Sequence, residues 1–141
     1  MNYLVFLEAQ AGELEKILSG TKSMVVKEFD PARSARQPVS PGDSLYFLRN
    51  KDDCTLRVIA TVVRVLSFTH HSDEDLSRIL KEMQPRFQFT EDQYNYWSVK
   101  KQVLLVEFEF AHKISVIQVS PHKIPDRSDW IAFEAFRLIT E

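Results

Sequence analysis

The chain has 141 residues, 44% of them hydrophobic and 27% charged, with a formal net charge of −2 at pH 7. A chain of this length can bury one sizeable core, so we expect a single domain over residues 1–141. The small negative net charge argues against binding of long duplex nucleic acid, so any nucleic-acid contact must come from a local basic patch. The lone Cys54 excludes an intramolecular disulfide and a cysteine-rich zinc site.

The first half of the chain alternates short predicted strands with one helix. Periodicity predicts strands at 3–8, 22–29 and 45–49, a helix at 12–18 that Gly20 ends, and a long strand at 54–68 that pairs with 45–49 as a hairpin. Both faces of the long strand carry apolar side chains, which is typical of a strand that curls around a barrel. Between the expected strands 22–29 and 45–49, the segment 30–38 is polar and bounded by prolines. It predicts a surface loop, which is the best place in the chain for a ligand.

The second half begins with two predicted helices inserted between strands. Ser72 and Thr90 each begin a pattern typical of a helix cap, and Pro85 is expected to end the first helix. Two further strands are expected, at 102–110 and 114–119, before a second proline-marked loop at 120–129. The alternation in the first of these strands predicts that four side chains face inward: Leu104, Val106, Phe108 and Phe110.

Two segments of the first half carry a resemblance to a known family. The pattern of residues 15–22 is typical of the end of an amphipathic helix that a strand follows directly. This places Lys22 at a helix-to-strand corner. Residues 39–47 read as a Pro-Gly-Asp turn feeding another strand. This arrangement resembles the ASCH family of the PUA superfamily, whose small β-barrels bind RNA or nucleotide-like ligands.

The family signature at this corner is Gly-x-Lys-x-x-Glu-x-Arg. Gly20 and Lys22 match it, whereas Val25 stands where the glutamate is expected and Lys27 stands where the arginine is expected. The resemblance implies an α+β fold, a small PUA-like, ASCH-type mixed β-barrel with peripheral helices.

Lys22 has two interpretations. In a barrel mouth, partial desolvation would lower its pKa and make it a base or an anion anchor, whereas at the surface it would be a solvated cation near a helix C-terminus. Some relatives in the superfamily are amidohydrolases that act on N4-acetylcytidine with this lysine, a threonine and a downstream glutamate. The resemblance makes Lys22 the catalytic candidate, but Val25 occupies the threonine position and offers no hydroxyl. The candidate acids are Glu74, Glu82 and Glu91.

Lys27, Arg33 and Arg36 add positive charge after the corner. They can form a phosphate-binding patch, because guanidinium groups match phosphate oxygens, or they can belong to a solvated loop of mixed charge.

Trp97 and Trp130 are candidate stacking platforms for a base. The alternative for each is a core tryptophan, an interpretation favoured for Trp130 by its apolar neighbours Ile131 and Phe133.

We expect no metal and no cofactor. The histidines, at 70, 71, 112 and 122, lack metal-ligand spacing, and the three glycines form no phosphate loop. The N-terminus has no cationic leader and no apolar run of membrane-spanning length, so we expect a cytoplasmic protein without a membrane partner.

The preferred function is a domain that binds RNA or a nucleotide, with a modified base as one such ligand. The site would combine Lys22, Lys27, the loop with Arg33 and Arg36, and an aromatic residue. The first alternative is a small amidohydrolase acting on an acylated nucleoside. The second is a protein-interaction module, which would leave a helix face partly exposed: Leu76, Ile79 and Leu80.

Overall fold

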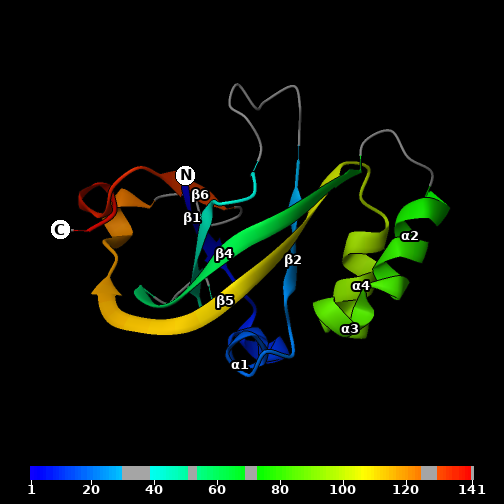
Figure 1. Ribbon diagram of the computed structural model, residues 1–141, viewed down its shortest axis with the longest axis horizontal. Coiled ribbons are helices and arrows are strands. Elements are labelled where there is room, and N and C mark those ends of the chain that lie inside the picture. Colours follow the sequence, from blue (N-terminus) through cyan, green and yellow to red (C-terminus); the bar gives the residue numbers. More distant parts are fainter. Residues whose placement is uncertain (30–38, 51–53, 69–72, 125–129, 141) are drawn as a thin grey trace.

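A mixed sheet of six strands dominates the computed structural model, which describes residues 1–29, 39–50, 54–68, 73–124 and 130–140 (Figure 1). The strands are β1 (Asn2–Phe6), β2 (Met24–Glu28), β3 (Ser44–Leu48), β4 (Thr55–Phe68), β5 (Val103–Gln118) and β6 (Ile131–Phe133). Their order in the sheet is β2-β5-β4-β3-β1-β6. Only the pair β1–β3 is parallel among these strands.

The sheet curls into a half-barrel because its two longest strands are bent. β4 and β5 pair antiparallel along their lengths, and their register shifts at three places. Each shift places unequal numbers of residues on the two strands, which bends the ladder and increases its twist. The expected α+β architecture of a curled mixed sheet with peripheral helices is therefore confirmed.

Both faces of the sheet are buried where β2 and β5 pair. Val25, Leu104 and Val106 belong to the cluster inside the curl, here called the barrel core. Met24 and Leu105 belong to a second cluster, the helix–sheet core, which lies between the sheet and the helices. Alternation along each strand assigns neighbouring side chains to opposite cores.

Three helices cover the outer face of this part of the sheet, as Figure 1 shows: α2 (Asp73–Glu82), α3 (Gln84–Phe87) and α4 (Glu91–Ser98). Pro85 occupies the first turn of α3 rather than simply ending α2, a position where its missing N–H costs no hydrogen bond. The predicted cap of α4 is confirmed, since Thr90 and Gln93 form a reciprocal capping box. The cap expected at Ser72 lies outside the described residues.

The helix face that an interaction module would expose is covered. Leu76 and Leu80 are 0% and 1% exposed in the helix–sheet core, and Ile79 packs against the same core. That expectation is wrong, because the face packs on the sheet.

The remaining helix, α1 (Glu13–Leu18), lies at the base of the sheet, and short 3-10 turns are η1 (Ala9–Ala11), η2 (Pro121–Lys123) and η3 (Phe136–Leu138). β6 and η3 enclose a third cluster with β1 and β3. No described helix has the length and apolar character needed to cross a bilayer.

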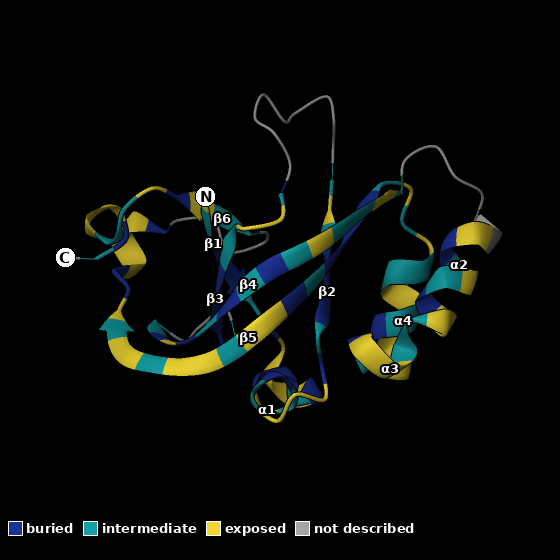
Figure 2. Cartoon of the chain, in the orientation of Figure 1, coloured by how far each residue is buried: buried dark blue, intermediate teal, exposed yellow. Residues whose placement is uncertain are grey.

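Two expectations about the last long strand are wrong. The segments 102–110 and 114–119 form one continuous strand, β5, rather than two. Phe110 does not face inward with Leu104, Val106 and Phe108: it is 72% exposed and has a φ of +60°. The bulge opposite Ala60 breaks the alternation, and Figure 2 shows the curled half of β5 largely exposed.

Candidate functional site

Glycines stand at both ends of α1, and the second of them, Gly20, begins the corner between α1 and β2. Gly12 precedes α1 with a φ of +64°, and Gly20 follows it with a φ of +80°, a region that other residues rarely adopt. The backbone N–H of Lys22 then donates to Lys16 O at 3.0 Å, which closes the end of the helix. The corner fixes the direction in which the Lys22 side chain leaves the backbone.

Lys22 points into the protein, where its side chain is 1% exposed. Its Nζ lies 3.4 Å from Glu13 Oε1 and donates to Phe87 O at 2.5 Å. The rings of Phe87 and Phe89 lie with their centroids 5.9 Å and 5.3 Å from Nζ. The interpretation of Lys22 as a solvated surface cation is therefore wrong.

Burial lowers the pKa of Lys22 because the charged form loses its hydration, and the neighbouring Glu13 carboxylate opposes that shift. A lysine whose pKa is lowered gives up its proton more readily, so beside a carboxylate it can take part in proton transfer. The same contacts also describe a buried ion pair with a structural role.

Glu13, the carboxylate partner, was missed by the sequence reasoning. It is 7% exposed, and its Oε2 accepts the backbone N–H of Glu8 at 2.7 Å. The proposed acids do not take this place: Glu82 and Glu91 are exposed, and the side chain of Glu74 lies outside the described residues. One signal was available, since Glu13 is four residues before Ile17 and therefore lies on the buried face of the helix.

Lys22 is also one of three donors at the end of α3. Ser23 N–H donates to Arg86 O at 2.8 Å, Lys22 Nζ to Phe87 O at 2.5 Å, and Lys16 Nζ to Gln88 O at 3.3 Å. Carbonyls at a helix C-terminus lack partners within the helix, and they favour nearby cations. The α1–β2 corner therefore caps α3 and ties the helices to the sheet.

A second candidate cluster lies at the opposite end of β2. Lys27 shares the barrel-facing side of the strand with Val25, and its Nζ lies 5.8 Å from the centroid of the Trp130 ring. Trp130 in turn packs against Tyr3, with ring centroids 6.1 Å apart and planes at 62°. Both Lys27 and Trp130 are half-buried, so an aromatic ring and a cation meet at the edge of the barrel core.

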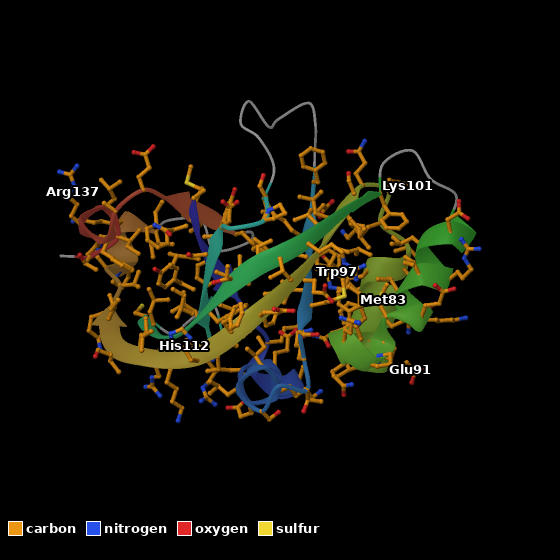
Figure 3. The ribbon with its side chains drawn as sticks, in the orientation of Figure 1. Met83, Glu91, Trp97, Lys101, His112 and Arg137 are labelled. Atoms are coloured by element: carbon orange, nitrogen blue, oxygen red, sulfur yellow. The ribbon has the colours of Figure 1, made fainter. Side chains whose placement is uncertain are left out.

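The other predicted site residues are divided between different parts of the molecule. Arg33 and Arg36 lie outside the described residues, in a segment that begins directly after Phe29. Trp97 lies on α4 and packs against the helix–sheet core, so it belongs to a different cluster from Trp130. Figure 3 shows Trp97 on the sheet-facing side of the helices, far from His112 on the curled part of β5.

No group of three or more His, Cys, Asp or Glu side chains within the described ranges has the arrangement of a metal site. His70 and His71 fall outside those ranges. The two clusters that contain predicted site residues are therefore the buried Lys22–Glu13 pair and the half-buried Lys27–Trp130 pair.

Comparison with known proteins shows the fold. No family model and no curated protein matches the sequence. Among solved structures, ZmASCH from Zymomonas mobilis has a TM-score of 0.64 at 11% identity, over 94% of this chain and 87% of that one. A tyrosine-to-phenylalanine mutant of ZmASCH has a TM-score of 0.65 at 10% identity, over 94% and 90% of the two chains. The chain therefore has an ASCH-type, PUA-like fold.

Proposed function

We propose that this protein binds single-stranded RNA or a nucleotide at the barrel edge formed by Lys27 and Trp130. The observation that carries the proposal is the Lys27 ammonium 5.8 Å from the Trp130 ring centroid, at the end of β2. Aromatic rings stack on bases and cations contact phosphates, a combination typical of single-strand binding sites. Arg33 and Arg36 follow a few residues later in the sequence and supply further phosphate ligands.

Lys22 does not belong to this binding surface. Its ammonium is enclosed by Glu13, Phe87 and Phe89, and its side chain is 1% exposed. A phosphate could reach it only if the helices moved away from the corner. We therefore assign the RNA contacts to Lys27, Arg33 and Arg36.

Salt dependence tests this assignment. Neutralising Lys27, Arg33 and Arg36 with glutamine should reduce the slope of log Kd against log salt by about 2 units for a short single-stranded RNA, because each phosphate contact contributes ~0.7. The measurement is fluorescence anisotropy over a series of salt concentrations.

A matched control removes three charges elsewhere. Arg57, Arg78 and Lys113 are exposed and lie on β4, α2 and β5. Their replacement by glutamine gives the same change in net charge and is expected to leave the slope nearly unchanged. Equal slopes for both triple variants would remove the barrel edge from the interface.

The Lys22–Glu13 pair favours a second candidate, the small amidohydrolase. It supplies a base and a carboxylate 3.4 Å apart, as hydrolysis of an acylated nucleoside requires. Against it, Val25 is 5% exposed in the barrel core and carries no hydroxyl at the position where the relatives have a threonine.

We expect no release of cytidine when the purified protein is incubated with N4-acetylcytidine, because the Lys22 ammonium is enclosed and an oxyanion donor is lacking at Val25. Chromatography of the nucleoside products checks this expectation. Turnover that is lost in a folded Glu13→Gln variant would reverse the order of the two candidates.

A further inference from the structure

A second pair of an aromatic ring and a cation lies on the helix side of β2. Lys100 Nζ is 4.4 Å from the centroid of the Tyr96 ring, and Tyr96 is 55% exposed. The same ammonium lies 3.5 Å from Glu28 Oε2. The proposed RNA site does not use these groups.

The two pairs flank the same end of one strand. Lys27 and Glu28 are consecutive residues of β2, so their side chains leave opposite faces. Val25 in the barrel core and Val26 in the helix–sheet core establish which face is which. Lys27 therefore reaches Trp130 inside the curl, while Glu28 reaches Lys100 beside α4.

The Tyr96 ring is held in place before any ligand arrives. Trp97 contacts it edge to face, with centroids 5.0 Å apart and planes at 89°, and Lys100 covers part of it. The helix that carries both rings is anchored at its start by the capping box of Thr90 and Gln93. A ring fixed in this way loses little conformational entropy when a base stacks on it.

We propose that Tyr96 and Lys100 form a second stacking point for single-stranded RNA, so that the bound strand crosses the end of β2 from Trp130 to α4. The inference rests on the proposed function. It adds the path that the RNA follows over the surface and the length of RNA that the site needs. Charge complementarity supports RNA as the occupant, because the next residue after Lys100 in the sequence is a second, exposed lysine, Lys101. Alternating rings and cations along a path are typical of surfaces that bind single strands.

Glu28 is the acidic group at this point, and it is 57% exposed. It pairs with Lys100 in the free protein, and an RNA phosphate competes with it for the ammonium. Glu28→Gln should therefore strengthen the binding of long RNA and leave the binding of short RNA unchanged.

The test is a length series with two oligouridylates. One is a trinucleotide, and the other has about ten nucleotides, a length within the ~4–16 nucleotides that one OB-fold domain covers. Tyr96→Ala should weaken binding of the long oligomer roughly 5- to 150-fold, the range for the loss of one stacked base, and should not change binding of the trinucleotide. Tyr96→Phe keeps the ring and should retain the affinity.

Lys100→Gln is compared with Arg78→Gln, which removes one exposed positive charge on α2. Only Lys100→Gln should reduce the advantage of the long oligomer over the short one. Unchanged affinity of Tyr96→Ala for the long oligomer would overturn the inference while leaving the Trp130 site in place. Equal weakening of both lengths would also overturn it. The RNA-binding part of the proposed function fails if the wild-type protein binds neither oligomer.

Discussion

Replacing Lys22 with alanine is expected to lower the free energy of unfolding by about 3–5 kcal/mol, the usual cost of removing one partner from a buried ion pair. Glu13, 7% exposed, would keep a charge without its partner, and Phe87 O would lose a donor at 2.5 Å. The measurement is denaturant unfolding followed by circular dichroism, which reports the midpoint and the slope separately.

An exposed ion pair on the same helix provides the control. Arg49 pairs with Glu15 of α1, and these side chains are 43% and 53% exposed. Arg49→Ala should cost less than about 1 kcal/mol, because water screens and solvates both charges. A similar small loss for Lys22→Ala would contradict the structural role assigned to the buried pair.

The double variant Lys22→Met, Glu13→Gln separates the charge from the packing. It removes both charges, and the glutamine oxygen can still accept the Glu8 N–H that Glu13 now accepts at 2.7 Å. The double variant should therefore be less destabilised than the sum of its two single variants. Additive losses would show that the two side chains are not coupled.

Replacing Trp130 with alanine is expected to weaken the binding of a short single-stranded RNA roughly 5- to 150-fold, the effect of losing one stacked base. The ring is half-buried and has Lys27 Nζ 5.8 Å from its centroid, so both the stacking face and the position of the cation depend on it. Anisotropy titrations at one fixed salt concentration measure the change, since affinity depends strongly on salt.

Two aromatic substitutions control for packing. Trp130→Phe retains a ring against Tyr3 and should preserve most of the affinity. Trp97→Phe alters a tryptophan of the helix–sheet core and should leave the affinity of a short RNA unchanged. An RNA affinity that falls with Trp97→Phe but not with Trp130→Ala would move the site from the barrel edge to the helices.

Local sequence patterns predicted most of the helices and strands, because the type and the ends of such an element depend largely on residues that are neighbours in the chain. The apolar spacing of Leu14 and Ile17 predicted α1, and Thr90 predicted the start of α4. The prediction failed at Phe110, where the bulge opposite Ala60 turns the side chain outward. A bulge depends on how two strands align, which alternation within one strand does not reveal.

The site was predicted in part. The corner placed Lys22 correctly between a helix and a strand, because Gly20 and the apolar periodicity are local signals. Its partner Glu13 was missed, because an acidic residue at a helix start ordinarily reads as a solvated group that favours the helix dipole. Its burial appears only once α1 is packed.

The sequence by itself determined the order and type of most elements and the helix-to-strand corner at Lys22. It also supplied Lys27 as a candidate phosphate ligand. Only the tertiary structure decided that Lys22 is buried against Glu13 and Phe87, and that Lys27 meets Trp130. The physical reason is the distance along the chain over which each interaction acts. Periodicity and caps act over a few residues, whereas the desolvation of an ammonium and its contact with a ring depend on segments that only the folded sheet brings together.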